Sequence, residues 1–141
     1  MRGEEGPMIN TKRLLLAYLL AVLVGAGYET LVYGLALHNF HQQHAELLKP
    51  QEQLPMARMM LSSALNVALI TVFYALFARG GAARASTGVL FGVFLGLIAG
   101  WMQQLMPHMV LNNYPFYLAW APANFGYFLV LGVVLGLAYR D

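Results

Sequence analysis

Long apolar runs alternate with short polar segments along this chain. Four runs, at about residues 14–37, 59–77, 87–106 and 116–139, are close to or above the roughly 20 residues that a helix needs to cross about 30 Å of hydrocarbon. A helix satisfies its own backbone groups without water. The pattern therefore predicts an all-α, polytopic membrane protein, a bundle of four transmembrane helices in one domain, residues 1–141.

The composition agrees with a chain surrounded by lipid. Hydrophobic residues make up 60% and charged residues 10% of it, whereas soluble domains carry about 25% charged residues. The first run has an alternative interpretation as a signal peptide, with small residues at Gly25, Ala26 and Gly27 as a cleavage site. The run continues to Leu37, which favours a membrane span.

The basic residues predict the orientation of the spans, because cytoplasmic loops carry an excess of Lys and Arg. With the N-terminus inside, only Lys49 and Arg58 lie on the outer side. The inner side then holds Arg2, Lys12, Arg13, Arg79, Arg84 and Arg140. An even number of spans returns the C-terminus to the inner side. We therefore expect both termini in the cytoplasm and an outer loop at residues 38–57.

Glycines recur every four residues along the third run, and a further pair lies in the fourth run. Residues four apart share one helix face, so the successive GxxxG motifs form a groove that a second helix can approach closely. This helix-packing interface either joins two helices of one chain or binds another protomer or protein. We call the six residues of this interface the glycine ridge, and they are Gly88, Gly92, Gly96, Gly100, Gly132 and Gly136.

One polar side chain in each run lies at a similar depth, roughly 6–14 Å below the outer surface at 1.5 Å per residue. These side chains are Glu29, Asn66, Gln104 and Asn124. A carboxylate at membrane depth costs about 3 kcal/mol and usually faces a bundle interior or a water path. The layer is either a pocket for a cation, a proton or a small solute, or a hydrogen-bond network that fixes helix packing. Tyr33, one turn beyond Glu29, is its nearest expected partner.

The histidines of the outer loop are weak candidates for a metal site. A spacing of three places His38 and His41 on one helix face, but a solvated or headgroup-level segment explains them as well. If the first helix continued outward, both would point away from Glu29. The chain has no cysteine, and we find no nucleophile–base pair and no basic patch. We therefore expect no enzymatic activity, no cofactor and no nucleic-acid partner.

Several segments carry a resemblance that is distributed over most of the chain. They are GYETLVYG in the first run, GVLFGVFLGLIAG in the third, NNYPFYLAW in the outer turn and NFGYFLVLGVVLGLAYR in the fourth. In this layout the chain resembles a family of small bacterial four-helix membrane proteins, a domain of unknown function. The resemblance implies a multi-pass protein of the bacterial inner membrane and no particular activity.

Two functions are consistent with these features. The first is an accessory subunit of a larger membrane complex, or a module that self-associates as a homo-oligomer through the glycine ridge. The second is a small transporter or channel that uses the polar layer around Glu29. Both require the lipid bilayer as the surroundings of the chain.

Overall fold

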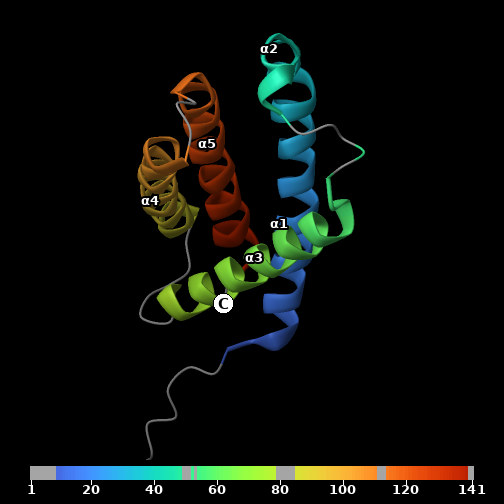
Figure 1. Ribbon diagram of the computed structural model, residues 1–141. Helices are drawn as coiled ribbons and strands as arrows, with labels where there is room; N and C mark the ends of the chain where they lie inside the picture. Colours follow the sequence, from blue (N-terminus) through green and yellow to red (C-terminus); the bar gives the residue numbers. More distant parts are fainter. Residues whose placement is uncertain (1–8, 49–51, 53, 79–84, 111–113, 140–141) are drawn as a thin grey trace, which may run out of the picture.

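The computed structural model describes residues 9–48, 52, 54–78, 85–110 and 114–139, without the side chains of residues 47 and 100–117. All regular structure in this part of the chain is helical (Figure 1), which confirms the all-α prediction. The longer elements are α1 (Thr11–Leu31), α3 (Met56–Phe77), α4 (Ala85–Val110) and α5 (Tyr114–Ala138). The shorter ones are the π-helical segment η1 (Val32–Ala36), α2 (His38–Gln43) and the 3-10 turn η2 (Ala45–Leu47).

Within the described residues, three helices are long and apolar enough to cross a membrane. They cover Thr11–Ala36, Met56–Phe77 and Leu118–Ala138. In α4 the apolar stretch with described side chains is shorter and covers Ala85–Ala99. These helices support a membrane protein, in agreement with the apolar runs of the sequence.

The first span begins at a local capping signal. The side chain of Asn10 accepts a hydrogen bond of 3.2 Å from the backbone N–H of Arg13, which satisfies one of the free donors of the first helical turn. The α-helical pattern ends at Leu31, and Leu37 N–H then bonds to the carbonyl of Val32, five residues earlier. The expected outer loop contains helical structure, because α2 and η2 lie within it.

The long helices do not lie in one parallel bundle. Figure 1 shows α4 beside α5, and α1 on the other side of α5. By contrast, α3 crosses in front of α1 at an oblique angle (Figure 1). The start of α1 and the end of α5 lie at the same end of the molecule, and α2 lies at the opposite end.

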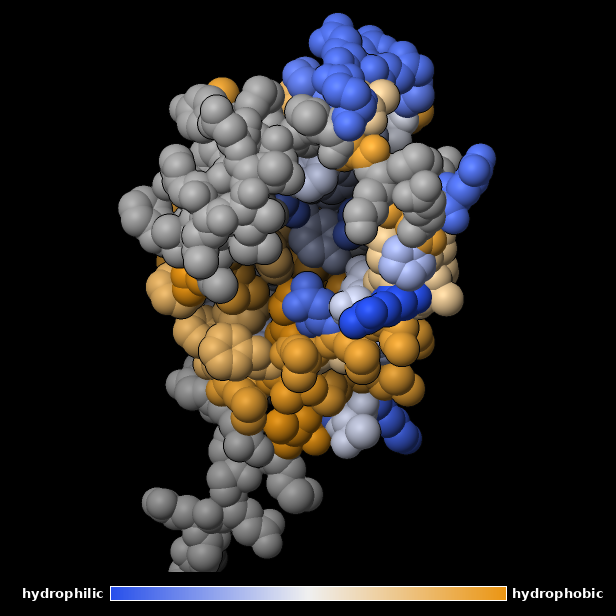
Figure 2. Space-filling view, viewed as in Figure 1, coloured by the Kyte–Doolittle hydropathy of each residue, from blue (hydrophilic) through white to orange (hydrophobic). Residues whose placement is uncertain are grey.

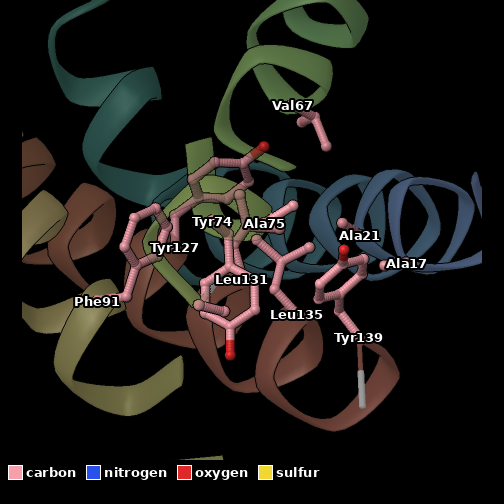
Figure 3. Close-up of a cluster of buried hydrophobic side chains, with 11 residues drawn as sticks. Ala17, Ala21, Val67, Tyr74, Ala75, Phe91, Tyr127, Leu131, Leu135 and Tyr139 are labelled. Atoms are coloured by element: carbon pink, nitrogen blue, oxygen red, sulfur yellow. The ribbon is translucent and has the colours of Figure 1, made fainter. Parts of the chain in front are cut away.

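The core lies where α3 crosses the other helices. Its largest fully buried side chains come from α3 and α5, and they are Thr71, Tyr74, Leu131 and Leu135. Figure 3 shows these leucines between the ring of Tyr74 and the small residues Ala17 and Ala21 of α1. The ring of Phe91 in α4 packs edge-on against Tyr74, with 5.2 Å between the ring centres. All four long helices therefore meet at this level of the molecule.

Candidate functional site

The glycines of α4 lie directly against α5 of the same chain. A Cβ atom on Gly92 would come within 2.6 Å of the Phe128 carbonyl oxygen, and one on Gly96 within 2.8 Å of the Phe125 ring. Both distances are far shorter than an ordinary van der Waals contact. Hydrogen is therefore the only side chain that these positions accept without movement of α5.

The close contact is formed from both sides. A Cβ atom on Gly88 would come within 2.8 Å of Gly136 Cα, and one on Gly132 within 2.7 Å of Gly92 Cα. Gly100 lies outside the residues whose surroundings are described. The sequence left open whether the ridge contacts a helix of the same chain or another protein. For Gly88, Gly92 and Gly96 the contact is with a helix of the same chain, because α5 occupies that face of α4.

A pocket of about 360 Å³ lies between α1, α3 and α5. Figure 2 shows it as a hollow at the centre of this face, next to α3 and bordered in part by hydrophilic side chains. Its polar lining comes from Glu29 of α1, Ser63 of α3 and Tyr127 of α5. The remaining lining is apolar and includes Met56 and Met59 together with Met60 and small aliphatic residues.

The wall of the pocket at α5 is a tyrosine held close to α1 by a glycine. A Cβ atom on Gly25 would lie 3.1 Å from the Tyr127 hydroxyl and 3.2 Å from its ring. This glycine therefore lets the Tyr127 ring approach the backbone of α1. Ser63 of α3 lines the same pocket as Tyr127.

A second tyrosine makes the same kind of contact in the opposite direction. Tyr28 of α1 donates a hydrogen bond of 2.8 Å to the carbonyl of Ala123 in α5. Its hydroxyl occupies the space that a Cβ atom would take on Gly126. The rings of Tyr28 and Tyr127 meet edge to face, with 5.9 Å between their centres. Two tyrosine–glycine contacts therefore join α1 to α5 beside the pocket.

Beyond these tyrosines along α1, an aromatic cluster joins the segment at the end of α1, together with α2, to α5. Tyr33 donates a hydrogen bond of 3.0 Å to the Asn124 side chain. Trp120 Nε1 donates one of 3.1 Å to His41 Nε2. The rings of Tyr33 and His41 stack nearly parallel, with 6.4 Å between their centres. Since the indole N–H is only a donor, His41 must present an unprotonated Nε2 in this arrangement.

The π-helical segment explains why His41 lies in this cluster. An uninterrupted α-helix turns about 100° per residue and would point His41 away from Glu29. The bond from Leu37 N–H to the Val32 carbonyl instead spans five residues. This extra residue in the turn changes the direction of everything beyond it.

The four side chains of the expected polar layer have different surroundings. Glu29 lines the pocket, and Asn124 accepts the hydrogen bond from Tyr33. Asn66 is exposed on α3 and is not part of the pocket wall. The side chain of Gln104 lies outside the described residues. The structure therefore brings Glu29 and Asn124 to the same region of the α1–α5 contact, in separate interactions.

The expected metal ligands have other contacts. Gln42 Nε2 lies 2.9 Å from His38 Nε2, within hydrogen-bonding distance, and His41 bonds to Trp120. Within the part of the chain that the structure describes, no group of three or more His, Cys, Asp or Glu side chains is placed to hold a metal ion.

Comparison with protein-family models, with curated proteins and with solved structures finds no match to this chain. The resemblance to a family of small bacterial membrane proteins therefore stays a prediction. The functional argument depends on the pocket and on the helix contacts around it.

Sequence reasoning missed the residues that shape the pocket. Tyr28 contacts Gly126 and Tyr127 contacts Gly25, and the two members of each pair are far apart in the sequence. Each tyrosine directly follows a glycine, in the segments GYE and FGY. The recurrence of a Gly–Tyr pair in both helices is the one signal that was present.

Proposed function

We propose that this protein is a small membrane transporter that binds a cationic solute in the pocket beside Glu29. It has four spans in the bacterial inner membrane, with both termini in the cytoplasm. The observation that carries the proposal is a carboxylate-bearing pocket of about 360 Å³ between three helices. The sign of the solute charge follows from Glu29, because none of the described residues that line the pocket is basic.

The membrane placement has support from two features. The three apolar helices are long enough to cross hydrocarbon, and α4 continues as a helix of 26 residues, about 39 Å at 1.5 Å per residue. The first and last helices begin and end on the same side (Figure 1), as an even number of spans requires. Of the basic residues used for orientation, Arg2, Lys49, Arg79, Arg84 and Arg140 lie outside the described residues.

The environment of Glu29 favours a binding role over a packing role. Within the described residues, Asn124 is paired with Tyr33 and Asn66 lies away from the pocket, so neither bonds to Glu29. A carboxylate that only fixed helix packing would be expected to bond across the helix interface. Glu29 is instead exposed toward the hollow.

Flux through proteoliposomes tests this function. Purified protein would be reconstituted, and the uptake of Na⁺, K⁺, guanidinium and benzyltrimethylammonium would be measured for the wild type and for Glu29→Gln. We expect at least one of these cations to enter in a manner that requires Glu29. Glu46→Gln makes the same chemical change at an exposed site outside the pocket and should leave that flux unchanged. If no cation in the panel shows Glu29-dependent flux, the transport function is wrong.

A second candidate function is self-association or docking onto a larger membrane complex. The open surface for it lies on α1, where a Cβ atom on Gly27 would have no atom within 4 Å. On Gly34 the nearest atom would be Thr30 Cγ2 at 4.0 Å. Small residues on a free face permit close helix contact in lipid. The surface expected for association is therefore on α1 and not on the glycines of α4, which α5 covers.

Native mass spectrometry in mild detergent tests the second candidate. Gly27→Leu should dissociate a homo-oligomer or a complex that forms through this face, while the wild type retains it. Leu35→Ala, at an exposed position of the same span, serves as a control. A wild-type chain that stays monomeric, or a complex whose mass is unchanged by Gly27→Leu, excludes association through this surface.

A further inference from the structure

The size of the Glu29 pocket restricts what it can hold. Its volume of about 360 Å³ lies at the lower end of the range of about 300–1,000 Å³ that is typical for pockets binding small organic molecules. A bare metal ion needs several ligands at about 2–2.6 Å, and a pocket of this size with one carboxylate does not supply them. The volume therefore favours an organic ligand.

The lining of the pocket restricts the chemistry of that ligand. Among the described residues that line it, Glu29 is the one charged side chain, and the hydroxyl groups are those of Ser63 and Tyr127. The rest of the wall is aliphatic or thioether. A polar, strongly hydrated ligand would lose its water here without replacement hydrogen bonds. One positive charge on an otherwise apolar molecule matches the wall.

The ring of Tyr127 adds a second group suited to a cation. Tyrosine faces attract ammonium groups within about 6 Å of the ring centre. Gly25 permits Tyr127 to lie against α1, the helix that carries Glu29. A carboxylate and an aromatic ring from two helices therefore line the same hollow.

Three methionines form the side of the pocket at the beginning of α3. Met56, Met59 and Met60 have 51%, 48% and 69% of their surface exposed, so the packed core does not hold them in place. Methionine is flexible and polarisable, and it is common at surfaces that accept ligands of varied shape. This wall can adjust to several apolar groups.

From these features we infer that the pocket binds lipophilic monovalent organic cations, with Glu29 opposite the positive charge, Tyr127 beside it and the three methionines around the apolar part. The inference rests on the proposed function and names its substrate class. Because the hollow is open at the surface of the molecule (Figure 2), such a cation can reach the pocket from the surrounding lipid. Substrates would therefore be compounds that partition into membranes.

Calorimetric titration of the full chain in zwitterionic nanodiscs tests this inference with benzyltrimethylammonium as the probe. Its neutral carbon isostere, 2,2-dimethylpropylbenzene, has the same shape without the charge and serves as the matched ligand. We expect saturable binding of the cation. The isostere should bind with an affinity at least about tenfold lower, since loss of one partner of a buried charge pair is costly. Equal binding of both ligands would overturn the inference.

Two variants test the pocket in different ways. Glu29→Gln should weaken binding of the cation roughly tenfold or more, and Ala64→Phe should block it by filling the pocket while leaving the carboxylate in place. Glu46→Gln should bind as the wild type does. Thermal melting shows whether each variant is folded, and the comparison of the two ligands in the wild type stands even if both pocket variants unfold.

The outcomes separate the inference from the proposed function. If benzyltrimethylammonium does not bind but Na⁺ or K⁺ shows Glu29-dependent flux, the substrate class is wrong and the transport function stands. If the cation binds with full affinity to Glu29→Gln and to Ala64→Phe, the ligand lies elsewhere and the inference is overturned. If binding requires Glu29 but no cation is transported, the pocket is a binding site and the transport function is wrong.

Discussion

The α4–α5 contact and the α1–α3 contact show two ways in which apolar helices can meet. Between α4 and α5, backbone lies on backbone, because Gly88, Gly92 and Gly132 leave no side chain in the way. Between α1 and α3, no such glycine ridge exists, and α3 crosses obliquely (Figure 1). The first contact is filled by atoms, whereas the second leaves the Glu29 pocket open.

The difference follows from the forces that act in lipid. Hydrocarbon tails are as apolar as leucine, so helix association depends on close packing and on hydrogen bonds between helices. The α4–α5 pair obtains close packing along several turns. The α1–α3 pair does not, and α1 is instead attached to α5 by the tyrosine–glycine contacts at Gly25 and Gly126. A region that binds a ligand needs this kind of incomplete packing.

The largest effect should come from one methyl group added to the α4–α5 contact. Gly88→Ala places a Cβ atom against the backbone of Gly132 and Gly136, and backbone cannot rotate away as a side chain can. We expect a loss of about 2–3 kcal/mol, which is typical of an overpacked core. Unfolding in mixed micelles, followed by circular dichroism, measures it.

Gly27→Ala is the matched control for this prediction. The same methyl group would have no neighbour within 4 Å on α1. Replacement of glycine by alanine inside a helix usually stabilises by about 1 kcal/mol or less. Equal destabilisation by the two variants would contradict the difference between the tightly packed pair and the open face of α1.

A smaller effect should follow from Gly126→Ala, which affects the attachment of α1 to α5. The new methyl group would occupy the place of the Tyr28 hydroxyl and break its hydrogen bond to the Ala123 carbonyl. We expect a loss of about 1 kcal/mol, the usual net contribution of one hydrogen bond. The same unfolding assay measures it.

A double-mutant cycle with Tyr28→Phe identifies the cause of that loss. Without the hydroxyl, the methyl group on residue 126 has less to displace, so Gly126→Ala should cost less in this background than alone. Strictly additive effects would mean that Tyr28 and Gly126 do not interact as the structure describes.

The smallest effect concerns the bond between Trp120 and His41. Replacement of His41 by phenylalanine removes the nitrogen that accepts this hydrogen bond and keeps an aromatic ring at the same position. In a Trp101→Phe background, Trp120 is the remaining tryptophan. Its fluorescence emission should change when His41→Phe is added to this background.

His38→Phe provides the control for the fluorescence experiment. His38 lies within hydrogen-bonding distance of Gln42 and outside the contact between Trp120 and His41. The emission of Trp120 should therefore stay unchanged in this variant. Equal changes in His41→Phe and His38→Phe would show that the bond to His41 is not the cause.

The apolar runs were sufficient to predict the helices, because length and composition alone decide whether a helix suits hydrocarbon. The four-residue glycine spacing likewise predicted the surface of α4 that another helix covers. It did not identify the covering helix, since a row of glycines permits the close approach of any helix that has small residues at the contact. That choice is visible only in the approach of Gly88 to Gly132 and Gly136.

The pocket was only partly predictable. Glu29 was identified because a carboxylate within an apolar run is costly and therefore conspicuous. Its neighbours Ser63 and Tyr127 were not, because the crossing of α3 decides which side chains face it. The expectation for the direction of His41 assumed a regular α-helix, whereas the turn at Val32–Ala36 follows a different hydrogen-bond pattern.

That π-helical turn makes the α2 end of the molecule sensitive to chain length. Shortening Val32–Ala36 by one residue would restore an ordinary turn and swing α2 around the axis of α1 by about 100°. Trp120 and Asn124 on α5 would then face different side chains from those they now meet. One surplus residue, and not the chemistry of any side chain, thus sets which part of the segment after α1 lies against the last helix.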